Sequence, residues 1–84
     1  MGDEKEKPHE IKIEVNERPV VMKQQRATGR EIKQAAIAQG VPIQLDFVLS
    51  EELGERRSRV IGDNEEVHLH EHEKFIAVAP DDNS

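Results

Sequence analysis

Three histidines, His68, His70 and His72, recur at every second position near the C-terminal end of the chain. Residues spaced by two on a β-strand project from one face, and imidazoles that share a face can hold a Zn²⁺ or Ni²⁺ ion. However, successive side chains on one face lie about 7 Å apart, which is wide for a single ion, and no cysteine or nearby aspartate completes a ligand set. We therefore predict no metal site, and we interpret the histidines as the solvent-facing side of a strand whose Val67 and Leu69 point into the core.

Hydroxyls and acids that could take part in catalysis are present but are not arranged for it. Ser50 and Ser58 lie near acids, yet no histidine is placed to serve as a general base for either hydroxyl. The adjacent carboxylates Glu51 and Glu52 fall in a polar stretch, where we expect no burial to raise a carboxyl pKa. The glycines are isolated and form no phosphate-binding loop. We therefore predict a non-catalytic protein with no cofactor.

The composition favours one small domain with a lean core. The chain has 84 residues and a formal net charge of −6, with 36% charged and 35% hydrophobic residues and no cysteine. A negative chain does not suit a nucleic-acid backbone, which rewards clustered Lys and Arg, and a chain without cysteine has no disulfide framework. No apolar run approaches the roughly 20 residues that span a bilayer, and residues 1–7 lack the apolar region of a signal peptide. We expect a cytoplasmic monomer that binds proteins rather than nucleic acid or membrane.

A short amphipathic helix is expected to organise the chain, beginning at Thr28 and ending near Gly40. The segment from Thr28 to Glu31 has the pattern of a capping box, in which the hydroxyl accepts from the Glu31 N–H and the carboxylate accepts from the Thr28 N–H. Gly40 suits the left-handed residue that closes the last turn, and Pro42 prevents the helix from continuing. Both ends of the helix are therefore specified locally.

One face of this helix is apolar. Ile32, Ala35 and Ala36 fall on the same side, while Lys33 and Gln34 are expected to turn toward solvent. A helix of about ten residues does not persist alone in water, because its nucleation cost is barely recovered over that length. It therefore needs a surface to lie on, which the rest of the chain is expected to supply.

The residues before the helix predict an antiparallel hairpin. Ile11, Ile13 and Val15 alternate with polar residues in the period of a half-buried strand. Residues 16–19 supply turn chemistry, and residues 20–24 form a second β-rich run. Because the connection is so short, the two strands should pair in opposite directions.

The residues after the helix predict three further strands and one loop. Residues 43–49 alternate with a strongly apolar inner face, and residues 67–70 and 74–79 follow as the last two strands. Residues 50–59 have no clear period and contain a basic cluster beside glutamates, so we interpret them as a solvated loop. The expected core consists of Ile11, Ile13, Val15, Ile32, Ala36, Leu45, Phe47, Leu49, Val67 and Leu69, with Phe75 joining them.

This order of elements predicts a single α+β domain over residues 10–80, with one sheet covered on one face by the helix. Residues 1–9 and 81–84 are polar and show no periodicity, so we expect them to be disordered tails. The sequence contains no internal repeat.

The order of hairpin, helix, strand, loop and strands, together with the residues at its joints, resembles the ubiquitin-like β-grasp fold. The chain looks more closely like the prokaryotic multiubiquitin domain family over roughly residues 11–80. The resemblance implies a mixed sheet of four to five strands with one helix across one face. By analogy with ubiquitin, the first strand and residues 67–70 should run parallel at the centre, with residues 75–79 as the alternative. The matching segments are Val15-Asn16, Thr28-Gly29-Arg30-Glu31-Ile32, Asp63-Asn64-Glu65-Glu66-Val67-His68-Leu69 and Phe75.

The resemblance also implies a function. It suggests a ubiquitin-like modifier or protein-binding module of a bacterial ubiquitin-like conjugation pathway, with activating or conjugating enzymes among its partners. The chain holds one copy and ends in residues 80–84 without a terminal Gly-Gly. Because adenylation and thioester transfer need a slender C-terminus, we expect this chain as it stands to be a poor substrate for activation. Two alternatives stay open, namely a sulfur-carrier-like β-grasp protein and a plain protein-interaction domain unrelated to conjugation.

In ubiquitin-like proteins the outer face of the sheet is the usual docking patch. Val48 alternates outward from Phe47 and Leu49, which places an apolar side chain on the surface. The resemblance places His68 and His70 near it on the same face. We therefore predict a protein-binding patch made of Val48, His68 and His70.

Overall fold

The computed structural model describes residues 10–80, which contain seven strands and one helix. The expected tails, residues 1–9 and 81–84, lie outside the described residues. In chain order the elements are β1 (Ile11–Val15), β2 (Arg18–Met22), β3 (Arg26–Thr28), α1 (Gly29–Ala38), β4 (Val48–Gly54), β5 (Arg57–Ile61), β6 (Glu66–His68) and β7 (Lys74–Val78).

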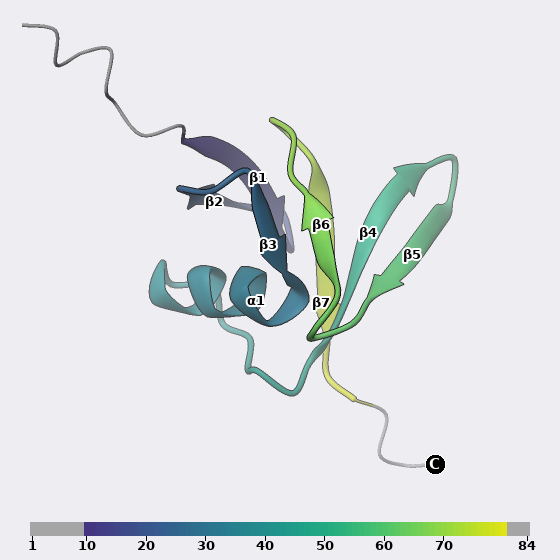
Figure 1. Ribbon diagram of the computed structural model, residues 1–84. Helices are drawn as coiled ribbons and strands as arrows, with labels where there is room; N and C mark the ends of the chain where they lie inside the picture. Colours follow the sequence, from purple (N-terminus) through teal and green to yellow (C-terminus); the bar gives the residue numbers. More distant parts are fainter. Residues whose placement is uncertain (1–9, 81–84) are drawn as a thin grey trace, which may run out of the picture.

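Five of the strands form one mixed sheet in the order β2-β1-β7-β4-β5. β1 and β7 run parallel at its centre, while the other neighbours are antiparallel. α1 lies across one face, and the two-stranded ladder of β3 and β6 covers the same face beside it (Figure 1). The predicted α+β ubiquitin-like β-grasp fold is confirmed.

The central parallel strand is β7 and not the segment at residues 67–70. β6 instead pairs antiparallel with β3, so that Val67 lies opposite Ala27 and both are buried. The expectation of a central strand at residues 67–70 is therefore wrong, and the alternative near residues 75–79 is right. The composition differs in the same sense, because β7 carries an unbroken apolar run from Phe75 to Val78, whereas residues 67–70 alternate with histidines.

The helix begins as the sequence predicts. The Thr28 hydroxyl accepts from the Glu31 N–H at 3.2 Å, and the Glu31 carboxylate accepts from the Thr28 N–H at 2.9 Å, which completes the capping box. Gly40 follows the last turn with a φ of +98°, a conformation that glycine adopts without strain. The antiparallel β1–β2 hairpin is also confirmed, with Ile13 directly opposite Val20.

Two predicted core residues, Leu45 and Phe47, are only half-buried. β4 begins at Val48, and the preceding residues form turns, in which the Phe47 N–H donates to the Gln44 carbonyl at 3.0 Å. These turns interrupt the alternation expected for residues 43–49. The observed core consists of Ile11, Ile13, Val15, Val20, Met22, Ala27, Ile32, Ala36, Val41, Ile43, Leu49, Ile61, Val67, Leu69, Phe75 and Ala77.

Residues 50–59 are not a loop, because most of them belong to the β4–β5 hairpin. Its turn residues Glu55 and Arg56 adopt φ values of 51° and 68°, which are left-handed conformations without glycine. The register shifts between Glu52 and Gly54, so Leu53 is an extra residue on β4. Polar side chains on both faces hide this hairpin from a search for hydrophobic period.

Candidate protein-binding surface

The outer face of the sheet, opposite α1, carries four aliphatic side chains around one serine. Ser50 on β4 lies directly opposite Val60 on β5 and opposite Ile76 on β7, and Val48 lies opposite Val78. Directly opposed residues share a face, with Cβ atoms about 5 Å apart. We call Val48, Val60, Ile76 and Val78 the outer aliphatic patch.

This patch is accessible in the described residues. Val48, Val60 and Val78 are 40%, 60% and 52% exposed, while their neighbours along the strands, Leu49 and Ala77, are buried in the core on the other face. A single exposed valine is ordinary on a protein surface. Several exposed valines on three neighbouring strands form an apolar patch, and such patches are typical of protein-interaction sites.

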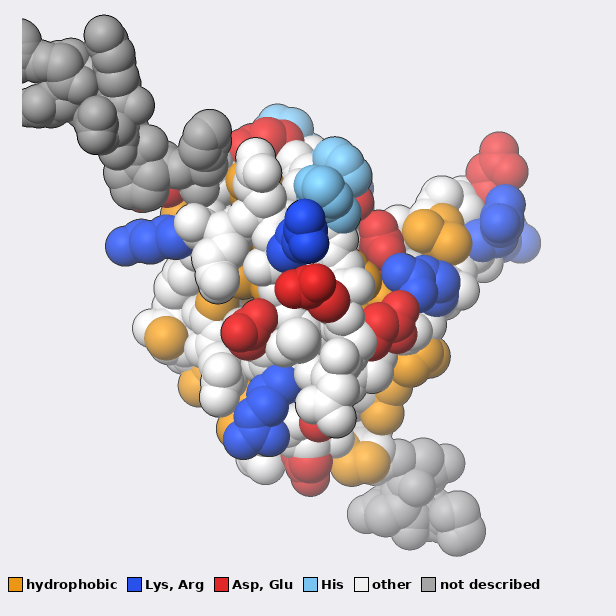
Figure 2. Space-filling view, in the orientation of Figure 1, with side chains coloured by type: hydrophobic (Ala, Val, Ile, Leu, Met, Phe, Trp, Pro, Cys, Tyr) orange, Lys and Arg blue, Asp and Glu red, His pale blue; other side chains and the backbone are white. Residues whose placement is uncertain are grey.

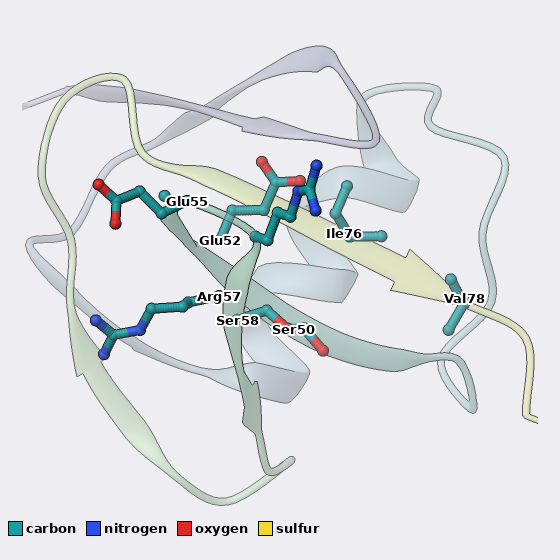
Figure 3. A pocket seen from close by; sticks show the side chains of 9 residues that line it. Ser50, Glu52, Glu55, Arg57, Ser58, Ile76 and Val78 are labelled. Atoms are coloured by element: carbon teal, nitrogen blue, oxygen red, sulfur yellow. The ribbon is translucent and has the colours of Figure 1, made fainter.

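A hollow of about 420 Å³ lies at one side of the patch, where the twisted β4–β5 hairpin rises beside β7 (Figure 3). Ile76 and Val78 supply its apolar lining from β7, and Ser50 and Ser58 line it from the hairpin strands. Charged side chains near the hairpin turn complete its wall. An apolar centre with a polar rim is the usual anatomy of a protein-binding surface. The hollow can therefore accept an aliphatic side chain while the rim satisfies polar groups around it.

Lys33 holds the beginning of β4 in place. It is only 3% exposed, and its ammonium donates to the carbonyl oxygens of Leu45 and Phe47 at 2.7 Å each and pairs with Asp63 Oδ1 at 2.8 Å. The prediction that Lys33 turns toward solvent is wrong, because its amine reaches three oxygens from distant parts of the chain and a buried charge is retained only when it is so partnered. The same hydrogen bond lowers the pKa of Asp63. Lys33 thus fixes the turn immediately before Val48.

A close backbone contact fixes the other end of the hairpin. The Gly29 N–H donates to the Glu65 carbonyl at 3.1 Å, and the Arg30 N–H donates to the Asp63 carbonyl at 3.2 Å. A Cβ at Gly29 would overlap the Gly62 carbonyl oxygen, so only glycine fits at this position. The start of α1 therefore rests directly on the turn that follows β5.

Arg59 links the hairpin to this turn on the inner side of the sheet. Its guanidinium donates to Glu65 Oε2 at 2.6 Å and lies 3.7 Å from Glu51 Oε1. The hydrogen bond from Arg59, followed by that from the Gly62 N–H, lowers the pKa of Glu65. The pKa of Glu51 is raised, first by burial and then by the nearby charge of Glu73, so the expectation that burial raises no carboxyl pKa here is wrong.

The structure brings His68 and His70 together but does not bring Val48 to them. Their rings stack with centroids 5.5 Å apart, and His70 Nδ1 lies 3.2 Å from Glu73 Oε2. His68 ends β6, and the histidine side chains gather at one end of the molecule (Figure 2), whereas Val48 lies opposite Val78 at the end of β7. The predicted patch of Val48, His68 and His70 is therefore not one surface.

No group of three or more His, Cys, Asp or Glu side chains in residues 10–80 is arranged to hold a metal ion. No helix in the same residues has both the length and the apolar character needed to cross a membrane.

The other three members of the patch, Val60, Ile76 and Val78, were not predicted to lie on this surface. The sequence pattern that could have identified them is the alternation of buried and exposed residues along each strand. Val60 precedes the buried Ile61, and Val78 follows the buried Ala77, so both point to the outer face. Alternation alone does not say which strands are neighbours. Only the observed order β7-β4-β5 shows that these residues meet around Val48.

Comparisons with known proteins complete the assignment. A comparison with curated proteins and a comparison with solved structures each find no match. A family model described as Multiubiquitin matches residues 11–81, a range that holds every element of the sheet and the whole outer aliphatic patch. Because this family model matches most of the chain, and because the fold is a mixed sheet covered by one helix, the chain belongs to the multiubiquitin family.

Proposed function

We propose that this chain is a non-catalytic, ubiquitin-like protein-binding module that acts in the cytoplasm within a ubiquitin-like conjugation pathway of bacterial type. The observation that carries the proposal is the outer aliphatic patch, in which Val48, Val60 and Val78 are exposed on three adjacent strands. Membership of the multiubiquitin family supports a ubiquitin-like role. Activating or conjugating enzymes are the partners we propose.

Binding through this surface needs no rearrangement of the domain. A partner would place an aliphatic side chain over Ile76 and Val78, in the hollow beside the hairpin. Because Lys33 anchors the entry to β4 and Gly29 anchors the turn after β5, the patch is held on a rigid support. A preformed surface loses little conformational entropy on binding.

His68 and His70 remain proposed binding residues, but at a separate contact. Both side chains are exposed, so their imidazoles could form hydrogen bonds with polar or acidic groups of a partner. A partner that covers the outer aliphatic patch would need to extend around the sheet to reach them. We therefore propose them as a secondary site.

The affinity of a cognate activating or conjugating enzyme for two matched variants tests the main site. Val78→Asp places a charge in the outer aliphatic patch, whereas Ile37→Asp places the same charge at a 38% exposed position on α1, across the sheet. We expect Val78→Asp to weaken binding at least tenfold and Ile37→Asp to leave it within about twofold, since an uncompensated buried charge is costly at an interface. Equal loss in both variants, with both folded, would contradict the proposed site.

A second assay separates a covalent modifier from a binding module. The chain is incubated with the activating enzyme and ATP, and adenylate or thioester products are sought by mass spectrometry. A product would support the modifier role. Binding without a product would support the module alone.

A further inference from the structure

The two edge strands of the five-stranded sheet, β2 and β5, differ in whether their outward backbone groups are hydrogen-bonded. At the β2 edge, the side-chain amide of Gln39, at the end of α1, accepts from the Val21 N–H at 2.9 Å and donates to the Val21 carbonyl at 2.8 Å. The Gln39 amide therefore makes the two hydrogen bonds that a residue of a neighbouring strand would make to Val21. The backbone groups at the middle of the β2 edge are thus not free to pair with another strand.

The β5 edge has no such cover in the described residues. β5 pairs with β4 on one side, and no other described residue forms a hydrogen bond to the backbone of residues 57–61. β5 lies at the outer limit of the molecule, on the side away from β2 (Figure 1). A row of free N–H and C=O groups on an edge strand is a template for an additional strand.

The side chains of this edge define what could pair with it. β5 carries two arginines, Arg57 and Arg59, and no acid, although the chain as a whole has a net charge of −6. On the outer face it presents Val60, which is 60% exposed. Arg59 is already paired with Glu65, but no ion pair within residues 10–80 involves Arg57. The exposed edge is thus basic, with one exposed aliphatic side chain, that of Val60.

Charge disfavours a second copy of β5 in the registers that pair most of the strand. Antiparallel pairing of two copies centred on Arg59 places this residue opposite itself, and pairing centred on Ser58 places Arg57 opposite Arg59. Like charges that lie directly opposite destabilise a strand pair, whereas opposite charges stabilise it. The favoured occupant has acidic side chains at alternate positions.

We propose that the free edge of β5 binds an extended segment of a partner protein in which acidic and aliphatic side chains alternate, as a sixth strand of the sheet. The acids would face Arg57 and Arg59, and the aliphatic side chains would lie beside Val60 and extend the outer aliphatic patch. The main-chain hydrogen bonds would supply affinity and the alternating side chains would supply specificity. This inference concerns the edge and not the face, so it stands or falls independently of the proposed function.

The probe is a capped synthetic hexapeptide of alternating aspartate and valine, with a peptide of alternating lysine and valine as its counterpart. In ¹⁵N-labelled protein we expect the acidic peptide to shift the amide resonances of β5 and to slow their hydrogen exchange, while the basic peptide does neither. Shifts confined to β2, or no shift at millimolar peptide, would overturn the proposal. A dimer in sedimentation that buries the same amides would also overturn it.

A pair of variants tests the charge argument. Arg57→Glu should weaken the acidic peptide roughly tenfold and should favour the basic one, because it turns an attractive cross-strand pair into a repulsive pair. Arg18→Glu makes the same change on the closed β2 edge and should leave binding unchanged. Spectra of the free variants establish that both are folded. Equal effects of the two substitutions would show that net charge, and not the β5 edge, governs binding.

Discussion

The β1–β2 and β4–β5 hairpins lie at the two sides of one sheet but are built from different side chains. The first buries five apolar residues beneath the helix, and Gln39 closes its outer edge. The second buries only Leu49 and Ile61 and exposes Val48 and Val60. The difference shows that one hairpin stabilises the domain while the other presents surface, both the outer aliphatic patch and a free edge.

The largest expected contrast between the two hairpins comes from shortening one side chain in each. Ile13→Ala removes a fully buried side chain from β1, and we expect it to lower the free energy of unfolding by about 3 kcal/mol, a large part of the stability of a domain this small. Val60→Ala on β5 should change it by less than about 0.5 kcal/mol. Urea unfolding of both variants measures the difference. Similar losses would mean that the β4–β5 hairpin is as important for stability as the β1–β2 hairpin.

A smaller effect is expected at the ammonium that fixes the entry to β4. Lys33→Met keeps the aliphatic stem but leaves the Leu45 and Phe47 carbonyls without their donor. We expect a loss of about 1–2 kcal/mol, because the two half-buried carbonyl acceptors lose their donor and water replaces it only in part. Lys12→Met, at an exposed position of β1, is the control and should be nearly neutral. Equal unfolding midpoints for the two variants would contradict the role given to Lys33.

A substitution at the start of α1 sharpens the account of how the second hairpin is supported. Helix propensity alone predicts that Gly29→Ala stabilises the protein by up to about 1 kcal/mol. The Gly62 carbonyl occupies the space that the new methyl group needs, so we expect instead a loss of about 1–3 kcal/mol. The sign of the change in thermal unfolding decides between the two expectations.

The smallest effects are pH-dependent and have opposite signs in two acids. The pKa of Glu51 is raised, so its ionisation opposes folding, and Glu51→Gln should stabilise the protein at neutral pH. The pKa of Asp63 is lowered, so its ionised form favours folding, and Asp63→Asn should destabilise the protein at neutral pH. The Glu51 difference should shrink first, as the pH falls toward 4.5, because its pKa is raised in the folded protein. The Asp63 difference should persist to lower pH and shrink only below about pH 3.8, because its pKa is lowered in the folded protein. Unfolding curves recorded from pH 7 to about pH 2 test this, and the same sign for both variants would contradict it.

The sequence predicted the features that depend on neighbouring residues. The capping box of Thr28 and Glu31 is determined by four adjacent positions, and the alternation of residues 11–15 shows which side is buried. The partners of Lys33 come from residues 45, 47 and 63, so no local pattern shows that its charge is satisfied. The burial of this lysine depends on tertiary contacts, which the pattern of neighbouring residues does not contain.

The candidate site was predicted less completely than the fold, because it depends on which strands are neighbours. Val48 was recognised from its outward position, but its expected neighbours, His68 and His70, belong to the segment that pairs with β3. β5 was not predicted as a strand, because its polar residues give no hydrophobic period. The place of Val60 in the patch was therefore not predicted either. Strand order is a property of the whole chain, and alternation within single strands does not contain it.

The most direct test of the central claim is an amide chemical-shift map of the ¹⁵N-labelled chain, titrated with a cognate activating or conjugating enzyme. The account predicts that the largest shifts fall at Val48, Val60, Ile76 and Val78, and that Val78→Asp abolishes them while the protein stays folded. Shifts centred on α1 or on the β1–β2 hairpin, with the outer aliphatic patch unchanged, would contradict it.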